Sequence, residues 1–248
     1  MKNKLLSSYL RRILFLLSVV IFFVFSASAS NIKIDKNALL TGIDTSQKTA
    51  FINLDISWEN SWRTSTAETN YDAAWVFIKY KENNTSEWKH AYISTNFSDY
   101  TITNDNGVSA SFQSGTTDKK GLGVFIYRKK EGNGNINWDG IKFKWFYGNN
   151  GIKNIKNITI QAFAVEMVYV PKGGFSIGSG GAEASAFYTY PSINTPFIVS
   201  SESAITVGQT NGNLCYSKHR YAEPFYGIIP AVFPKGYNAF WCMKYEVT

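Results

Sequence analysis

Apolar and polar residues alternate along much of the chain after residue 30, in short runs that are separated by polar turns. Within 50–58, apolar residues from Ile52 to Trp58 occupy every second position, and polar residues lie between them. This period of two predicts a strand with one buried and one solvated face. The polar stretch 59–72 is predicted to be a long connection. Residues 73–80 are almost continuously apolar, as expected of a strand that is covered on both faces.

The same pattern continues to residue 165, and no stretch after residue 30 has a sustained helical period. Further strands are predicted at 88–93, 124–127, 141–147 and 157–165, with turns at 82–86, 131–135 and 148–151. About seven strands joined by polar turns indicate a mainly β fold, with a β-sandwich over residues 30–163. Five tryptophans are expected to supply its core, the alternative being a platform on which sugars stack: Trp58, Trp75, Trp88, Trp138 and Trp145.

The N-terminus has the three regions of a signal peptide. Basic residues come first, an apolar run follows at 13–25, and small residues lead to Ala29. We expect cleavage after Ala29, so that residues 1–29 are removed. The alternative is a membrane anchor, but the apolar run of 13 residues is shorter than the roughly 20 that span a bilayer. The protein is therefore expected to be extracellular, periplasmic or at the cell surface, with no stable transmembrane anchor after cleavage.

Charge argues against a nucleic-acid partner. Residues 1–29 hold four basic residues and no acidic ones, so that cleavage lowers the net charge from +7 to +3. No basic stripe remains in the chain that follows. The expected partner is instead a protein or a glycan.

Few residues offer reactive chemistry. Cys215 and Cys242 can form one disulfide in an oxidising compartment, or they can be two separate buried thiols, and the sequence leaves both alternatives open. His90 is expected to decorate a strand and His219 a loop, too few histidines for a catalytic triad or a multi-histidine metal site. The aspartates show no calcium-loop spacing. We therefore expect no catalytic, cofactor-binding or metal-binding residue.

From residue 164 onward the chain is irregular and contains two recognisable motifs. The first reads as a strand, a proline that ends it and a glycine reversal, and comprises Met167, Val168, Val170, Pro171, Gly173, Gly174, Phe175 and Gly178. The second closes the sequence and comprises Lys244, Tyr245, Glu246, Val247 and Thr248. In this order the two motifs resemble the opening of the formylglycine-generating-enzyme (sulfatase-modifying factor) domain.

The resemblance implies a C-type-lectin-like α+β domain at 164–248, truncated before its catalytic region and carrying a long insertion at about 180–239. Residues 30–163 resemble the β-domain that precedes this fold in some secreted bacterial proteins. Active family members oxidise a substrate cysteine with two cysteines and a bound copper ion. Those residues and the calcium ligands are expected downstream of Thr248, so copper and calcium are expected only if that part exists. Cys215 and Cys242 do not match the catalytic pair.

These observations favour an exported, non-catalytic surface or secreted protein with a binding or structural role. Its aromatic loops, at 187–191 and 216–226, are expected to contact the partner. The alternative is that the chain is a fragment of a larger formylglycine-generating oxidoreductase whose catalytic part lies beyond residue 248. If the second unit lacks its partners, residues 165–248 are expected to be more sensitive to proteases than 31–163.

Overall fold

The computed structural model describes residues 31–34, 38–117, 120–181, 185–216 and 226–246. The expected signal peptide, His219, Val247 and Thr248 lie outside these ranges. Within the described ranges, no helix is long and apolar enough to cross a membrane. The helical content there consists of short 3-10 helices: η1 (Phe97–Asp99), η2 (Tyr147–Asn150) and η3 (Ile155–Asn157). The fold is mainly β, as the sequence predicts.

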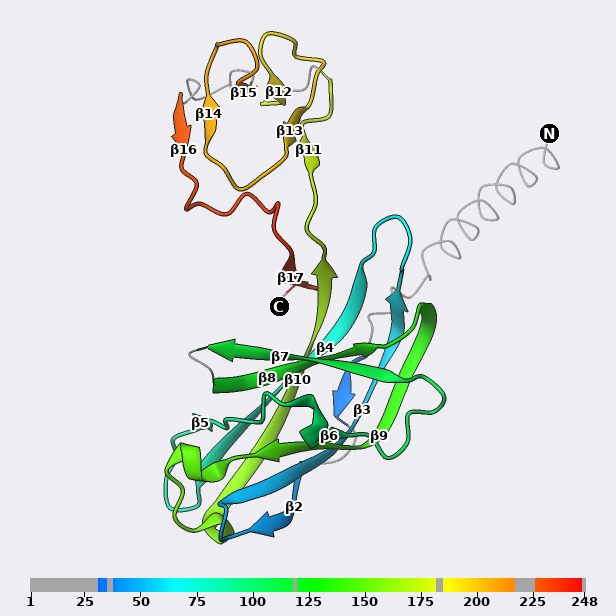
Figure 1. Ribbon diagram of the computed structural model, residues 1–248, viewed down its shortest axis with the longest axis vertical. Helices are drawn as coiled ribbons and strands as arrows, with labels where there is room; N and C mark the ends of the chain where they lie inside the picture. Colours follow the sequence, from blue (N-terminus) through cyan, green and yellow to red (C-terminus); the bar gives the residue numbers. More distant parts are fainter. Residues whose placement is uncertain (1–30, 35–37, 118–119, 182–184, 217–225, 247–248) are drawn as a thin grey trace, which may run out of the picture. The chain divides into compact units, whose positions relative to one another are not determined.

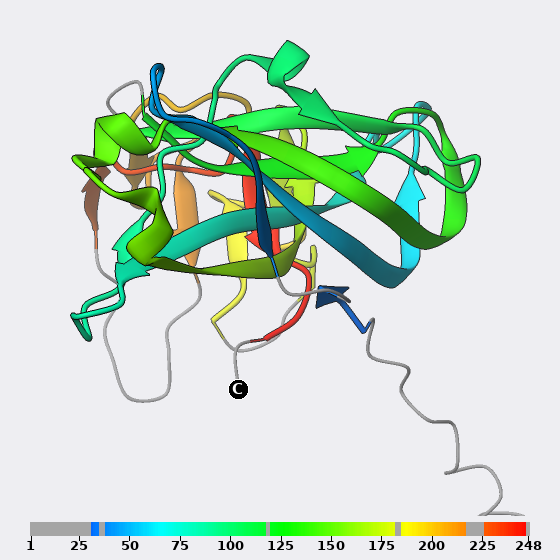
Figure 2. The same cartoon turned by 90° about the horizontal axis from the view of Figure 1, so that it is seen from below.

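One large antiparallel sheet contains most of the strands (Figure 1). In chain order these are β1 (Lys33–Ile34), β2 (Leu39–Asp44), β3 (Thr49–Arg63), β4 (Tyr71–Glu82), β5 (Lys89–His90), β6 (Tyr100–Thr101), β7 (Ala110–Thr117), β8 (Lys120–Arg128), β9 (Gly132–Trp145), β10 (Ile158–Val170) and β17 (Phe240–Met243). The main path through the sheet is β17-β10-β4-β3-β9-β6. The long strands are curled rather than flat (Figure 2).

Two groups of strands enclose the core. In one group β3 pairs with β9 and with β2, and in the other β4 pairs with β10 and with β8. The groups are joined where Arg63 of β3 pairs with Tyr71 of β4. Antiparallel pairing of this kind allows alternate side chains of every strand to point to the same interior.

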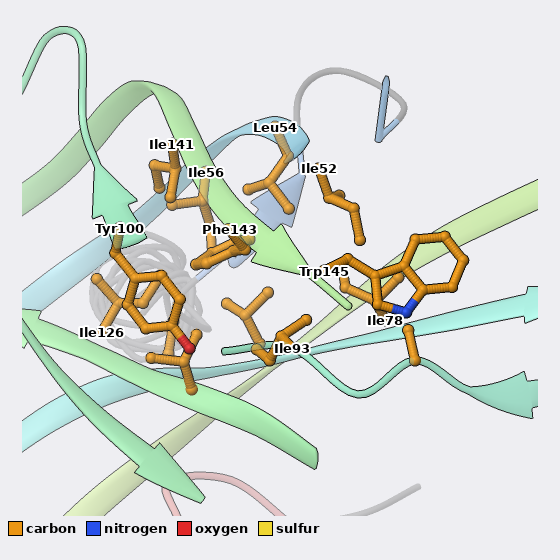
Figure 3. Packing of buried hydrophobic residues seen from close by; sticks show 14 of the residues in the cluster. Ile52, Leu54, Ile56, Ile78, Ile93, Tyr100, Ile126, Ile141, Phe143 and Trp145 are labelled. Atoms are coloured by element: carbon orange, nitrogen blue, oxygen red, sulfur yellow. The ribbon is translucent and has the colours of Figure 1, made fainter. Parts of the chain in front are cut away.

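The core confirms the alternation read from the sequence (Figure 3). Ile52, Leu54 and Ile56 of β3 are at most 1 % exposed. Complete burial of each such side chain contributes about 1.5–3 kcal/mol of transfer free energy. Trp58 and Trp138 meet edge to face, with ring centroids 5.2 Å apart, the geometry that the aromatic quadrupole favours.

The tryptophan prediction is confirmed for three of its five members. Trp58, Trp138 and Trp145 are buried in the core. Trp75 is only half-buried, because its position on β4 points it to the outer face of the sheet, where it packs on Phe125. For Trp88 the prediction is wrong: this residue precedes the short β5 and is 39 % exposed.

The predicted connection at 59–72 is also wrong over much of its length, because β3 continues to Arg63 and β4 begins at Tyr71. The register of β3 against β9 shifts between Trp58 and Ser61, and Asn60 has a φ of 54°. Such a bulge lets a strand continue through residues that break the alternation. On the predicted solvated face, Asp55 is buried instead, and its carboxylate accepts a hydrogen bond from Gly140 N at 2.7 Å.

Strand β10 crosses the boundary predicted between residues 163 and 164. It pairs with β4 without interruption from Ile158 to Tyr169 (Figure 1). The residues between β10 and β17 are here named the 171–239 segment, and their described part contains two small sheets. Their strands are β11 (Phe175–Ile177) with β13 (Phe197–Val199), and β12 (Phe187–Thr189), β15 (Leu214–Tyr216), β14 (Ile205–Val207) and β16 (Gly227–Ile229).

Candidate functional site

The two sequence motifs at 167–178 and 244–248 are brought together through the strand that precedes the second motif. Met167, the first residue of the first motif, lies opposite Met243, and the pairing of β10 with β17 extends to Val170 opposite Phe240. The 171–239 segment therefore leaves the large sheet and returns to it at neighbouring positions. Lys244 follows directly after β17, and its backbone N–H donates to the Glu166 carbonyl at 3.0 Å.

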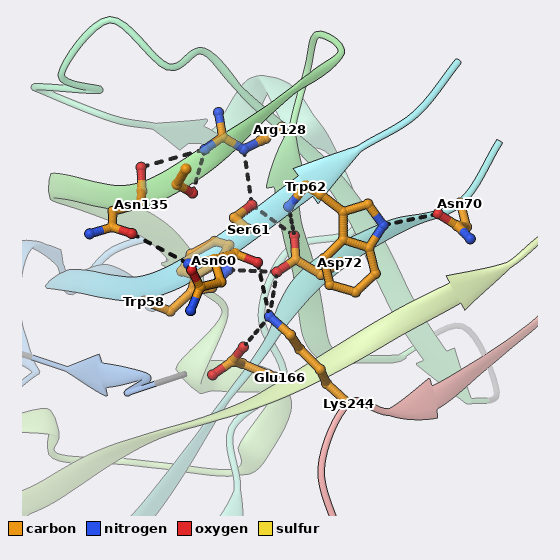
Figure 4. Close-up of polar contacts among 11 residues, drawn as sticks. Trp58, Asn60, Ser61, Trp62, Asn70, Asp72, Arg128, Asn135, Glu166 and Lys244 are labelled. Carbon is orange, nitrogen blue, oxygen red and sulfur yellow. Dashed lines mark hydrogen bonds and ion pairs between the residues drawn. The ribbon is translucent and has the colours of Figure 1, made fainter. Parts of the chain in front are cut away.

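Asp72 is the centre of a buried polar network at this place (Figure 4). Its carboxylate is fully buried, and it accepts hydrogen bonds from Trp58 Nε1 at 3.0 Å, Ser61 Oγ at 2.7 Å and Trp62 N at 3.0 Å. Three donors and a neighbouring cation satisfy a charge that burial alone would strongly disfavour.

That cation is Lys244. Its Nζ lies 3.2 Å from Asp72 Oδ2 and 3.1 Å from Glu166 Oε2, and it donates to the Asn60 carbonyl at 3.2 Å (Figure 4). We name Lys244, Asp72 and Glu166 the ion cluster. Burial alone would lower the pKa of Lys244, but the charges and hydrogen bonds of the two carboxylates outweigh it and leave that pKa raised.

Arg128 continues the network on β8. Its Nε donates to Ser61 Oγ at 3.0 Å, and its Nη2 donates to the Gly134 carbonyl at 2.6 Å. Ser61 thus links the guanidinium group to the carboxylate of Asp72. The fixed fork of an arginine suits such a bridge between strands, because several donors are held in one plane. The network ties β3, β4, β8, β9, β10 and the end of β17 together.

Trp241 attaches β17 to the outer face of the main sheet. Its ring is stacked on Phe125 of β8, with centroids 4.0 Å apart and an interplanar angle of 6°. Tyr71 and Tyr169 are stacked beside it at 4.8 Å, and Tyr71 meets Trp241 edge to face at 5.6 Å. Because these rings pack against one another, we interpret this face as a second apolar cluster of the fold.

Most of the first motif lines a cavity of about 680 Å³. Val170, Pro171, Gly173, Gly174 and Phe175 form one wall, and the opposite residues come from the β3–β4 loop and from around β17. The Gly173 N–H donates to the Tyr237 carbonyl at 3.0 Å and so joins the two ends of the 171–239 segment. The chain runs on from β10 to β11 without a hydrogen-bonded turn at 171–174, so the glycine reversal predicted there is wrong. The cavity has a largely apolar lining, to which the charged residues Glu68, Lys172 and Lys235 also contribute.

The other predicted site residues lie apart from this cavity. Gly178 has a φ of 98°, and an added Cβ would overlap the Phe187 carbonyl, so this position requires glycine. Val168 lies opposite Cys242 in the β10–β17 pairing. The ring of Tyr245 lies 5.6 Å from Lys244 Nζ, and Glu246 is exposed.

Both cysteines are free thiols in the structure. Cys215 is buried in β15, where it packs as a small apolar residue, whereas Cys242 is exposed on β17. Cys242 Sγ lies 3.8 Å from the Val168 carbonyl. Of the two alternatives that the sequence left open, the structure thus has separate thiols, and only Cys215 of the two is buried.

Of the two histidines, only His90 lies in the described ranges. His90 is half-buried on β5, with its Nδ1 3.2 Å from the Ile78 carbonyl and its ring against Phe77. Burial lowers the pKa of His90. Among the described residues, no group of three or more histidine, cysteine, aspartate or glutamate side chains could hold a metal ion.

Sequence reasoning missed the ion cluster. The sequence pattern puts Asp72 in a polar connection, and Glu166 lies between the predicted strand at 157–165 and the first motif, with no predicted role. One local signal was present, because Asp72 is in phase with the buried Ala74, Val76 and Ile78 of the following strand. An acidic residue at an inward position predicts a buried cationic partner, but the strand pattern does not identify it.

Comparison with known proteins gives no match to a protein-family model, to a curated protein or to a solved structure. The resemblance to the formylglycine-generating-enzyme domain therefore stays a prediction. What the geometry defines is a mainly β chain whose last described residues are locked into its main sheet by the ion cluster and by Trp241.

Proposed function

We propose that the protein is exported and acts outside the cytoplasm as a non-catalytic binding protein, with a protein partner contacting the 171–239 segment. The observation that carries the proposal is the exposure of apolar side chains on this segment. Ile198 is 64 % exposed, Ile228 66 %, Val232 90 % and Phe233 60 %. We name these four residues the apolar surface. The proposed role needs no cofactor.

The 171–239 segment has little apolar interior of its own. Its buried apolar residues in the described ranges are Ala186, Val199, Val207, Leu214 and Cys215. The four side chains of the apolar surface are large and are left in water, although burial of each is worth about 1.5–3 kcal/mol. Several large apolar side chains left exposed along one segment support a protein contact at that segment.

The finer fold assignment belongs to the same proposal. We take the strands around the core to be a β-sandwich-like domain and the residues from about 164 to be the start of a formylglycine-generating-enzyme-type domain. The first assignment is supported by two groups of antiparallel strands with inward alternation. The second is supported by β10, which carries the start of the first motif, and by β17, which precedes the second motif and returns beside it.

Export is tested by recovering the protein from its native cells and sequencing its N-terminus. The proposal expects a mature protein outside the cytoplasm that begins at Ser30, because cleavage follows Ala29. A cytoplasmic protein that retains Met1 would contradict it.

Partner binding is tested by site-specific photocrosslinking in the same cells. A photoreactive residue is introduced at Val232, and a matched control carries it at Lys130, which is also exposed but lies on the β8–β9 turn. We expect one defined protein adduct at Val232, its loss when Phe233→Ser is added, and none at Lys130. Equal adducts at both positions, or none at Val232, would contradict the proposal.

A further inference from the structure

A second cavity, of about 600 Å³, lies in the β-domain, away from the two sequence motifs. Its lining comes from the segment after β5, from η1, from the start of β8 and from the residues after β9. The side chains that matter are Tyr92, Ser94, Asn96, Asp99, Phe146 and Asn149. Its volume falls in the range of roughly 300–1,000 Å³ that small-ligand sites occupy.

The base of this cavity is rigid. Ile93 forms bridges with both Gly121 and Trp145, and its side chain is buried in the core (Figure 3). An added Cβ at Gly121 would overlap the Ile93 carbonyl, so only glycine allows this approach. The Ser94 N–H donates to the Lys144 carbonyl at 2.8 Å, and the Tyr100 hydroxyl donates to the Ser94 carbonyl. A site on such a base is preorganised, which lowers the entropic cost of binding.

The polar groups of the cavity are fixed but keep hydrogen-bonding capacity. Asp99 Oδ2 accepts a hydrogen bond from Ser94 Oγ at 2.6 Å, and Asp99 Oδ1 lies 3.6 Å from Lys144 Nζ. Asn96 Oδ1 accepts from Ser98 N at 3.2 Å, which orients the amide and leaves its Nδ2 as a donor. A carboxylate has about four acceptor positions, so Asp99 retains acceptors for a ligand.

The charge of this cavity and its aromatic walls define the class of ligand that it can bind. The Asp99 charge is balanced by Lys144, whose Nζ also lies over the Phe146 ring at 5.5 Å from its centroid, so the cavity carries no net charge that would select an ion, and a ligand on Phe146 must share that ring with the ammonium group. Tyr92 and Phe146 are half-buried aromatic walls, which suit a ligand with an apolar ring face. Paired acceptors and amide donors around such walls match a ring that carries several hydroxyl groups.

We propose that this cavity binds a neutral sugar residue of a glycan. The sugar ring lies against Phe146 and Tyr92, its hydroxyl groups donate to the Asp99 carboxylate, and they accept from the amides of Asn96 and Asn149. The site is independent of the apolar surface, so its failure would leave the proposed protein contact standing, and the reverse also holds.

The test is a glycan array probed with the purified protein, followed by calorimetry with the bound oligosaccharide. The array holds neutral gluco-, manno-, xylo- and galacto-oligosaccharides beside uronic and sulfated ones. We expect binding to a neutral glycan. Phe146→Ala and Asp99→Asn should each weaken it about tenfold, and Asn149→Ala at the exposed rim should weaken it several-fold.

The matched control is Phe97→Ala, because Phe97 is 47 % exposed on η1 but does not line the cavity. Its affinity should stay within about twofold of the unmodified protein. Thermal unfolding of each variant shows whether it is folded. If Phe146→Ala does not fold, Asn149→Ala still tests the site. Absence of binding to every neutral glycan, binding confined to acidic glycans, or unchanged affinity in folded site variants would overturn the proposal.

Discussion

Lys244 Nζ lies 3.2 Å from the fully buried carboxylate of Asp72, although 172 residues separate them along the chain. This contact joins the end of the described chain to the start of β4. Because the same ammonium group also meets Glu166 of β10, it bridges two adjacent strands of the main sheet. The cluster lies where the 171–239 segment meets the main sheet, because the segment is connected to β10 at one end and to β17 at the other.

Removal of the Lys244 charge should destabilise the protein strongly. Lys244→Met keeps most of the side-chain volume but leaves the buried carboxylates of Asp72 and Glu166 uncompensated. Loss of one partner from a buried ion pair costs about 3–5 kcal/mol. The free energy of unfolding, measured by guanidinium denaturation, should fall by about 3 kcal/mol.

The matched control for that variant is Lys89→Met. Lys89 pairs with Glu87 at 3.6 Å, and both side chains are at least half exposed. Surface pairs of this kind contribute about 0–1 kcal/mol. If Lys244→Met costs no more than Lys89→Met, then the ion cluster does not stabilise the fold.

A double-mutant cycle should show that Lys244 and Asp72 act together. Asp72→Asn keeps an acceptor for Ser61 and Trp62 but removes the charge that faces Lys244. We expect the effects of Asp72→Asn and Lys244→Met on the free energy of unfolding to be non-additive, with a coupling of about 1–3 kcal/mol. Additivity within about 0.5 kcal/mol would show that the two side chains are not coupled.

High pH should remove the contribution of the ion cluster. The pKa of Lys244 is raised above its ordinary value of 10.5. Folding therefore favours the protonated amine, and this stabilisation is complete below pH 10.5 and is lost as the pH rises through the raised value. The difference in unfolding free energy between the unmodified protein and Lys244→Met should be constant from pH 8 to about 10 and shrink above it.

The difference in unfolding free energy between the two proteins is the informative quantity, because tyrosines of the unfolded chain ionise in the same pH range. Burial raises the pKa of Tyr71 and of Tyr100, so both proteins lose stability as the tyrosines of the unfolded chain ionise. That loss is common to both proteins and cancels in the difference. A difference that stays constant through pH 12 would contradict the role assigned to Lys244.

Trp241 should matter more than its place near the end of the chain suggests. Its ring is stacked on Phe125 of β8 and meets the rings of Tyr71 of β4 and Tyr169 of β10, so Trp241→Ala removes contacts to three other strands. We expect a loss of about 2–3 kcal/mol, somewhat below the 3–5 kcal/mol of a fully buried tryptophan. Trp88→Ala, at a 39 % exposed tryptophan, is the control and should cost less than about 1 kcal/mol. Thermal unfolding of both variants gives the comparison.

The sequence predicted the large sheet more readily than the site for a physical reason. Strand alternation is a local pattern. It predicts the buried face of Ile52, Leu54 and Ile56 from the sequence alone, without information on the strands that pair with them. The burial of Asp72 and Glu166 depends on a lysine that only the tertiary fold brings near, as does the packing of Trp241 on Phe125. The burial prediction therefore failed at polar residues, which the local pattern assigns to the solvated face although the tertiary fold buries them.

Cleavage of the 171–239 segment by a protease should leave the two fragments associated. The pairing of β10 with β17 covers four residue pairs, and Lys244 and Trp241 hold the returning strand on the inner and outer faces of the sheet. The protease sensitivity expected for 165–248 should therefore be restricted to residues between Val170 and Phe240.

After a single cut there, a denaturing gel should show two bands, while size-exclusion chromatography shows one species of unchanged mass. The same cut in Lys244→Met should release the C-terminal fragment. Release from the unmodified protein as well would mean that the ion cluster and Trp241 are too weak to hold β17 in the sheet.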